Sequence, residues 1–139
     1  MRVLLDTNIV LDFLLQREPF FQQAVLLFQT MMVGSVTGYV TATTLTDIFY
    51  IARRHTKDVN EARQAVSITL SAMEICPVNR ATLATALTLG IVDFEDSVQI
   101  ACALEQQLDA VITRDASLDS RSIPVFSVEI FLDQLGFRQ

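Results

Sequence analysis

The side chains best suited to chemistry in this chain are aspartates that follow apolar segments. Asp6 comes directly after the apolar run 3–5, and Asp115 comes shortly after the apolar run 110–112. Apolar runs without alternation are typical of strands that are covered on both faces, as in a parallel sheet. Open α/β sheets bind their ligands beyond the carboxyl ends of the strands. We therefore expect Asp6 and Asp115 to lie at one edge of a sheet, where their carboxylates can reach a ligand.

Three further aspartates, Asp47, Asp93 and Asp96, stand near the expected beginnings of helices. Taken singly, they are explained by helix capping, since Thr44–Asp47 and Asp93–Asp96 have the spacing of a capping box. An acid that follows a strand can also cap the next helix. However, the first turns of helices that follow parallel strands lie at the carboxyl edge of the sheet. All these acids are therefore expected to meet there.

Such a meeting of acids is unfavourable by itself. Two carboxylates ~4 Å apart repel by on the order of 4 kcal/mol at an effective dielectric of ~20, and the stability of a whole domain is only ~5–15 kcal/mol. The cluster therefore needs protons or a cation. Ligand sets made only of oxygens suit Mg²⁺ or Mn²⁺, which supply positive charge for a phosphoryl oxygen and a water for attack. The chemistry best served is hydrolysis of a phosphodiester.

The overall charge fits this interpretation only if cations are bound. The net charge is −6 and the sequence pI is about 4.6, which argues against broad binding of a phosphate backbone. Two divalent ions would bring the charge from −6 to −2. Apolar residues make up 51% of the chain and the mean hydropathy is +0.40. This indicates either an apolar surface for a partner or dimer, or a helical core rich in Leu and Ala, and both readings stay open.

Other residue types exclude several chemistries. Cys76 and Cys102 form no CxxC pair and lie in apolar contexts, which predicts buried, reduced thiols. The single histidine, His55, leaves no zinc-type ligand set and permits a Ser–His–Asp triad only if it serves that triad itself. The chain shows no signal-peptide pattern and no apolar stretch of spanning length, so we expect a cytoplasmic protein without membrane contact.

The elements that must position the acids alternate between helices and short strands. Strands are expected at 3–5, 37–41, 75–78, 110–113 and 123–126. After a short first helix, helices are expected at 19–34, 43–57, 58–73, 79–91, 93–108 and 127–135. This alternation predicts a three-layer α/β/α sandwich with a central parallel sheet, formed by residues 1–139 as one domain.

Three segments resemble the ordered motifs of PIN-domain proteins: Asp6-Thr-Asn8, Asp93-Phe-Glu-Asp-Ser-Val-Gln-Ile-Ala-Cys-Ala103 and Ile112-Thr-Arg-Asp115. This family includes small metal-dependent ribonucleases, among them the VapC-type toxins of bacterial toxin–antitoxin pairs. The resemblance covers nearly the whole chain. It implies a sheet of about five strands with an order near 3-2-1-4-5, which agrees with the layered architecture expected above.

By this resemblance, four residues correspond in order to the catalytic acids of the family: Asp6, Asp47, Asp96 and Asp115. Asp6, Asp96 and Asp115 would hold Mg²⁺ or Mn²⁺ as the metal ligands. The second acid is usually Glu in the family, so Asp47, shorter by a methylene, would help directly or through water. Asn8, Asp93 and Thr113 would be secondary residues that orient a ligand or water or cap a helix.

The resemblance implies a metal-dependent endoribonuclease that hydrolyses RNA and is the toxin of a toxin–antitoxin pair. Its partners would be the RNA substrate, an antitoxin protein and a second copy of the chain in a homodimer. Arg114, beside Asp115, is a possible RNA phosphate contact, whereas the basic stretch 53–57 reads more simply as a solvated helix end. Two alternatives stay open: a non-catalytic binding or scaffold module of the same fold, and a general RNA-processing nuclease without an antitoxin.

Overall fold

A parallel sheet of five strands forms the centre of the molecule, in the order β3-β2-β1-β4-β5. The computed structural model describes residues 1–115, 118 and 122–137. The strands are β1 (Arg2–Leu5), β2 (Thr37–Thr41), β3 (Glu74–Cys76), β4 (Ala110–Ile112) and β5 (Val125–Phe126). All four pairings between neighbouring strands are parallel. The expected fold class and strand order are therefore confirmed.

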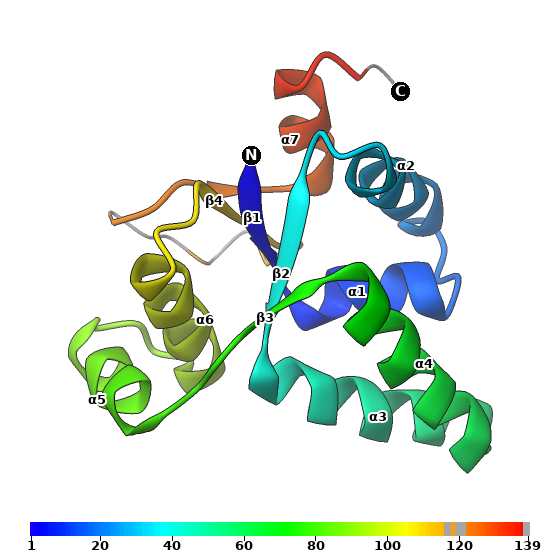
Figure 1. Ribbon diagram of the computed structural model, residues 1–139, viewed down its shortest axis with the longest axis horizontal. Coiled ribbons are helices and arrows are strands. Elements are labelled where there is room, and N and C mark those ends of the chain that lie inside the picture. The colour runs from blue at the N-terminus through cyan, green and yellow to red at the C-terminus, as the bar shows by residue number, and fades with distance from the viewer. Residues whose placement is uncertain (116–117, 119–121, 138–139) are drawn as a thin grey trace.

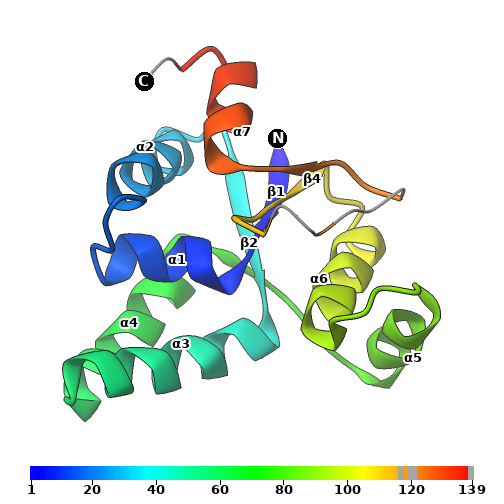
Figure 2. The same ribbon diagram turned by 180° about the vertical axis from the view of Figure 1, so that it is seen from behind.

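Helices cover both faces of this sheet, as Figures 1 and 2 show from opposite sides. They are α1 (Thr7–Leu14), α2 (Phe21–Met32), α3 (Ala42–Thr56), α4 (Val59–Ala72), α5 (Arg80–Thr88), α6 (Phe94–Glu105) and α7 (Val128–Gln134). In both views α5 and α6 lie on one side and the other helices on the opposite side. In the described part of the chain, no helix is both long and apolar enough to cross a membrane.

The apolar runs of the central strands are explained by two separate cores. Val3 and Leu5 of β1 belong to the core beneath α1 to α4 and α7, whereas Leu4 belongs to the core beneath α5 and α6. All three side chains are fully buried. A strand covered on both faces has no solvent side, so its sequence shows no alternation.

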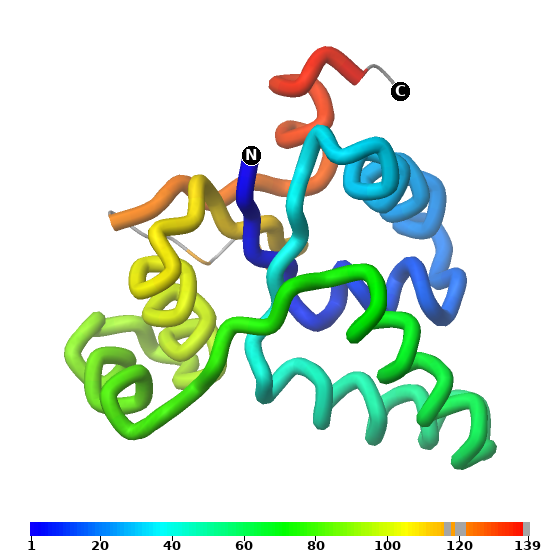
Figure 3. The backbone as a smooth tube through the Cα atoms, viewed as in Figure 1, coloured from blue at the N-terminus to red at the C-terminus, as the bar shows by residue number. Residues whose placement is uncertain are grey.

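Strands β1 and β4 are far apart in the sequence but lie side by side, as the tube in Figure 3 lets the reader follow. Leu5 pairs with Ile112, and the backbone N–H of Asp6 donates to the Ile112 carbonyl at 3.0 Å. The ladder thus extends one residue beyond β1. As a result, Asp6 and Thr113 stand next to each other where the two strands end.

The beginning of α3 differs from the expectation. The hydroxyl of Thr41 accepts the N–H of Thr44 at 3.2 Å, so Thr41 is the N-cap and α3 starts at Ala42. The predicted capping box of Thr44 with Asp47 is therefore wrong. Asp47 lies in the second turn of α3. Because Thr41 already caps the helix, the Asp47 carboxylate is not needed for capping.

Three other helices have a side-chain cap at the residue where the sequence predicts their start. Asp58, Asn79 and Ser127 each accept backbone N–H groups at the first turns of α4, α5 and α7. The second helix begins at Phe21, two residues beyond the expected Pro19.

Cys76 and Cys102 are free and buried, and burial raises the pKa of the Cys102 thiol to about 12. The prediction of buried, reduced thiols is confirmed.

Gly38 of β2 is a position where two methionine side chains approach the strand closely. A Cβ atom at Gly38 would lie 2.7 Å from Cε of Met31 and 2.9 Å from Cε of Met73. Because both are ends of flexible side chains, we expect Gly38→Ala to fold but to lose about 1 kcal/mol of unfolding free energy. Urea denaturation measures this loss, and a variant as stable as the original chain would contradict it.

Candidate active site

Asp6 lies at the carboxyl edge of the sheet, between β1 and α1, with its carboxylate oriented by two neighbours. Oδ2 accepts a hydrogen bond from the hydroxyl of Thr113 at 2.8 Å, and Oδ1 accepts one from Nε2 of Gln99 at 3.0 Å. Although Asp6 is the N-cap residue of α1, its side chain makes no capping hydrogen bond. The alternative interpretation, in which the Asp6 side chain caps the following helix, is therefore wrong, and the carboxylate bonds Thr113 and Gln99 instead.

Gln99 is a site residue that the sequence analysis missed. It lies in α6, its side chain is 1% exposed, and its Oε1 is buried without a hydrogen-bond partner among the described residues. A buried amide oxygen without a donor is costly, and this one belongs to the amide that bonds Asp6. The signal was present in the sequence, because Gln99 interrupts the apolar run of α6 one helical turn after Asp96.

Asp93, Asp96 and Asp115 line a cavity of about 510 Å³ at the same edge, together with residues 90–92 and Leu118. Asp93 caps α6, since it accepts the N–H of Asp96 at 3.1 Å. Burial and the charges of Asp93, Asp6 and Asp115 raise the pKa of Asp96 from 3.8 to about 6. Three acids from three segments therefore act on Asp96 through space.

Asp47 and Glu95 bring a second pair of acids to this edge. Burial, a hydrogen bond with Asp47 and the charges of Asp47, Asp6 and Asp93 raise the pKa of Glu95 from 4.5 to about 7. Glu95 belongs to the segment 93–103 that resembles a PIN-domain motif, but its position there predicts no role for it. Asp47 and Glu95 lie on α3 and α6, so their contact connects the helices on opposite faces of the sheet.

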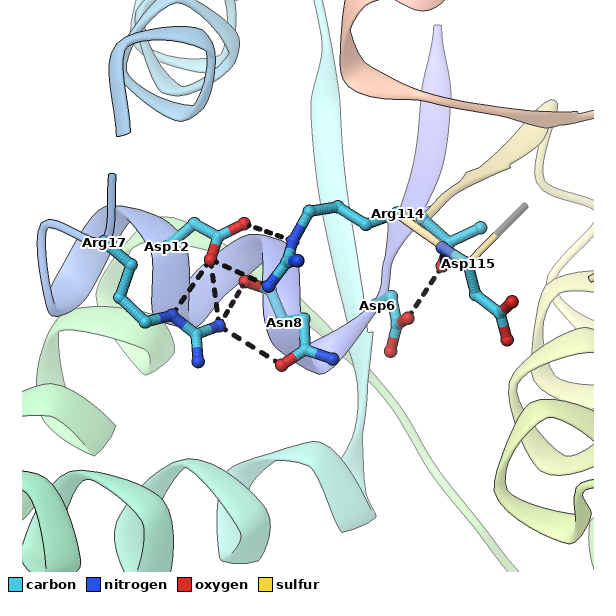
Figure 4. A network of polar contacts seen from close by, with 7 residues as sticks. Asp6, Asn8, Asp12, Arg17, Arg114 and Asp115 are labelled. Carbon is cyan, nitrogen blue, oxygen red and sulfur yellow. Dashed lines mark hydrogen bonds and ion pairs between the residues drawn. The ribbon is translucent and has the colours of Figure 1, made fainter. Parts of the chain in front are cut away.

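On the other side of Asp6, the buried carboxylate of Asp12 binds two arginines (Figure 4). Asp12 of α1 accepts Nε of Arg17 at 2.9 Å and Nε of Arg114 at 2.8 Å. Asn8, which is expected to orient a ligand or water, accepts a hydrogen bond from Nη2 of Arg17 through its side-chain oxygen at 3.2 Å. Figure 4 shows that Arg114 points toward α1, whereas its neighbour Asp115 points toward α6.

The chemistry of this donor set fits a hard divalent cation. The acids offer only carboxylate oxygens, and the hydrogen bond from Nε2 of Gln99 fixes the direction of one of them, Oδ1 of Asp6. Such ligands suit Mg²⁺ or Mn²⁺, which retain several waters. Residues 1–115, 118 and 122–137 contain no group of three acids already close enough to enclose an ion. The acids therefore lie near enough to repel one another, but no three of those described lie close enough to coordinate one ion without moving.

The fold and this edge of acids define the chain as a small α/β protein with the architecture of PIN domains. A family model described as PIN domain matches residues 2–117, which is most of the chain. The chain therefore belongs to the PIN-domain family. Curated proteins offer no match to the sequence.

Solved structures of similar fold include a toxin and a toxin–antitoxin complex. The VapBC2 complex of Rickettsia felis bound to a promoter DNA fragment shares 16% identity, with 90% of this chain and 97% of that chain covered and a TM-score of 0.66. A toxin–antitoxin complex from Klebsiella pneumoniae shares 20%, with coverages of 91% and 97% and a TM-score of 0.66. Mycobacterium tuberculosis VapC20, described as a toxin that cleaves the sarcin-ricin loop, shares 12%, with coverages of 83% and 91% and a TM-score of 0.66. At these identities the likeness shows the fold.

Proposed function

We propose that this protein is a metal-dependent ribonuclease that hydrolyses RNA phosphodiester bonds at the carboxyl edge of its sheet. The observation that carries the proposal is the convergence of Asp6, Asp93 and Asp115 on Asp96, whose pKa rises to about 6. Separate strands and helices supply these acids. Helix capping does not require these acids to lie near one another, and their mutual repulsion destabilises the fold.

In the proposed site, Asp6, Asp96 and Asp115 would hold Mg²⁺ or Mn²⁺. Such an ion would supply positive charge for a phosphoryl oxygen and would make a water more acidic for attack. Thr113 and Gln99 fix the direction of the Asp6 carboxylate through their hydrogen bonds.

Asp47 and Glu95 act beside these ligands. In the metal-free protein the pKa of Glu95 is raised to about 7, so its carboxyl group exchanges a proton with water near neutral pH, whereas a bound cation would favour the carboxylate. Asp47 helps the ligands directly or through water, and Asp93 holds the first turn of α6, which carries Asp96.

The direct test is cleavage of a labelled single-stranded RNA by the purified protein. We expect cleavage with Mn²⁺ or Mg²⁺ and none with EDTA. The acid cluster could instead belong to a non-catalytic binding or scaffold module of the PIN fold. In that case the protein would be stabilised by Mn²⁺ but would leave the RNA intact, which would refute the ribonuclease.

A toxin role is supported by two similar structures, of which one is described as a toxin–antitoxin complex and the other as a toxin that cleaves the sarcin-ricin loop. We therefore propose that this ribonuclease acts on cytoplasmic RNA and is inhibited by an antitoxin protein. Co-expression with a short neighbouring reading frame is expected to relieve growth arrest caused by the chain alone. If the chain cleaves RNA but causes no arrest, a general RNA-processing nuclease is the better description.

We further propose a homodimer, supported by the apolar composition of 51% and by exposed apolar side chains such as Leu70 and Tyr50. Size-exclusion chromatography with light scattering is expected to give about twice the chain mass of 15.5 kDa at micromolar concentration. A monomer mass that stays constant upon dilution and concentration would contradict this prediction.

A further inference from the structure

Asp12 is a buried charge in the last turn of α1, and two arginines from different segments bind it. Its side chain is 2% exposed. Arg114 makes two bonds to it, from Nε to Oδ2 at 2.8 Å and from Nη2 to Oδ1 at 3.2 Å. Arg17 adds a third bond, from Nε to Oδ1 at 2.9 Å. Both carboxylate oxygens are therefore fully engaged by guanidinium groups.

The charge of this group is not balanced. One arginine would neutralise Asp12, so the second leaves a net charge of +1, as the two ion pairs to one carboxylate show. The side chains of Arg17 and Arg114 are 29% and 32% exposed. Within the described part of the chain, their hydrogen bonds do not use every N–H group. Donors of both guanidinium groups therefore remain available at the surface.

Arg114 is also held from a second direction. Its guanidinium carbon lies 3.8 Å from the centre of the Phe20 ring, as in a stacked cation–π contact. The two parallel hydrogen bonds to Asp12 and the Phe20 ring stacked on its face restrict the orientation of the Arg114 guanidinium group. A charge held in place before binding loses less entropy when a partner arrives.

This fixed positive charge lies directly beside the acidic edge. Arg17 bonds the backbone oxygen of Asn8 at 3.0 Å, two residues after Asp6, and Arg114 precedes Asp115 in the chain. Figure 4 shows both guanidinium groups on the α1 side of Asp6, with the Asp115 carboxylate on the opposite side. A phosphodiester chain crossing Asp6 would meet a cation site on one side and arginine donors on the other.

We infer that Asp12 is a positioning residue that holds Arg114, with Arg17 beside it, as a clamp for an RNA phosphate next to the cleavage site. This inference rests on the proposed ribonuclease function and adds the means by which an acidic protein binds a polyanion. Asp12 has a second effect. By binding Arg114, it keeps that guanidinium from turning back onto the acids of the active site.

The test measures RNA binding in the Asp6→Asn background, in which the RNA stays intact. A fluorescein-labelled single-stranded RNA is titrated in Mg²⁺ over a series of KCl concentrations, with fluorescence anisotropy as the readout. Asp12→Asn is the decisive variant, because it removes a negative charge. Simple electrostatics would therefore make it bind RNA more tightly and with a steeper salt dependence.

If Asp12 positions Arg114, the opposite is expected. Binding by Asp12→Asn should be about tenfold weaker, as for loss of one charged hydrogen bond, and the logarithmic salt slope should shrink by about one. Adding Arg114→Gln to Asp12→Asn should weaken binding no further. Asp133→Asn, with the same charge change at an exposed position of α7, is the control and should bind no more weakly than the background. Tighter binding by Asp12→Asn than by the background would overturn the inference.

A second variant decides the matter even if Asp12→Asn does not fold. Arg114→Lys keeps the charge but cannot make two parallel bonds to Asp12, while Arg17 still neutralises that carboxylate. We expect Arg114→Lys to bind RNA as weakly as Arg114→Gln does. Binding by Arg114→Lys equal to that of the background would show that charge alone suffices, and the clamp would be wrong.

Cleavage by the chain without the Asp6→Asn change separates the two claims. If it leaves RNA intact with Mn²⁺ while the binding results are as expected, the ribonuclease proposal fails and the arginine clamp stands as an RNA-binding site without a cleavage site beside it. If it cleaves RNA and Arg114→Lys binds like the background, the clamp fails and the ribonuclease stands.

Discussion

Asp6→Asn is expected to reduce RNA cleavage at least about a thousandfold while leaving the fold intact. The loss follows because an amide is a poor ligand for Mg²⁺ or Mn²⁺ and carries no charge. The fold survives because Gln99 can turn its amide over. Its Oε1, which is buried and unsatisfied among the described residues, then accepts the NH₂ of the new amide at position 6. Thr113 can still donate to the remaining oxygen.

The measurement combines RNA cleavage with thermal melting in EDTA. The metal-free melting temperature of Asp6→Asn should be no lower than that of the original chain, because one repelling charge near Asp96 is gone. Asp133→Asn, an exposed change of the same charge in α7, serves as the control and should cleave normally. Cleavage by Asp6→Asn at the original rate would remove Asp6 from the proposed site.

Mn²⁺ is expected to stabilise the protein strongly at pH 8 and weakly at pH 5. The folded-state pKa of Asp96 is raised from 3.8 to about 6 and that of Glu95 from 4.5 to about 7. Raised pKa values mean that the folded state binds protons more tightly than the unfolded state. The stability they contribute is fully present below pH 4 and is lost as the pH rises toward 7. The metal-free protein should therefore become less stable over this range.

A divalent ion replaces the missing protons at high pH and competes with them at low pH. At about a hundredfold excess over its dissociation constant, Mn²⁺ should raise the melting temperature by roughly 5–10 °C at pH 8. NaCl at equal ionic strength is the control for screening. A melting temperature unmoved by Mn²⁺ at pH 8 would contradict a metal site at this edge.

The elements and their order were predictable because each follows from local pattern. The apolar runs of β1 and β4 identify strands covered on both faces, and parallel connection through helices then places their carboxyl ends together. Asp6 and Asp115 could be assigned to one edge from this rule alone. The beginning of α3 could not, because Thr41 and Thr44 are both good capping residues and only the strand that precedes them decides between the two.

The contacts that tune the site were beyond prediction for a different reason. The bond from Gln99 to Asp6 spans 93 positions, and that from Arg114 to Asp12 spans 102. Pairing over such separations depends on how far each helix is rotated about its axis. Spacing along one element does not determine that rotation. Arg114 was recognisable as a basic residue beside an acid, but the carboxylate that holds it lies in another segment.

The central place of β1 has a consequence for folding. Asp6 follows β1, whereas its hydroxyl donor Thr113 follows β4, 107 positions later in the sequence. Contacts of such separation form late, because a long loop must close first. A folding intermediate in which only β1, β2 and β3 have paired therefore has an Asp6 carboxylate without its hydroxyl donor, and the acidic edge is completed when β4 joins β1.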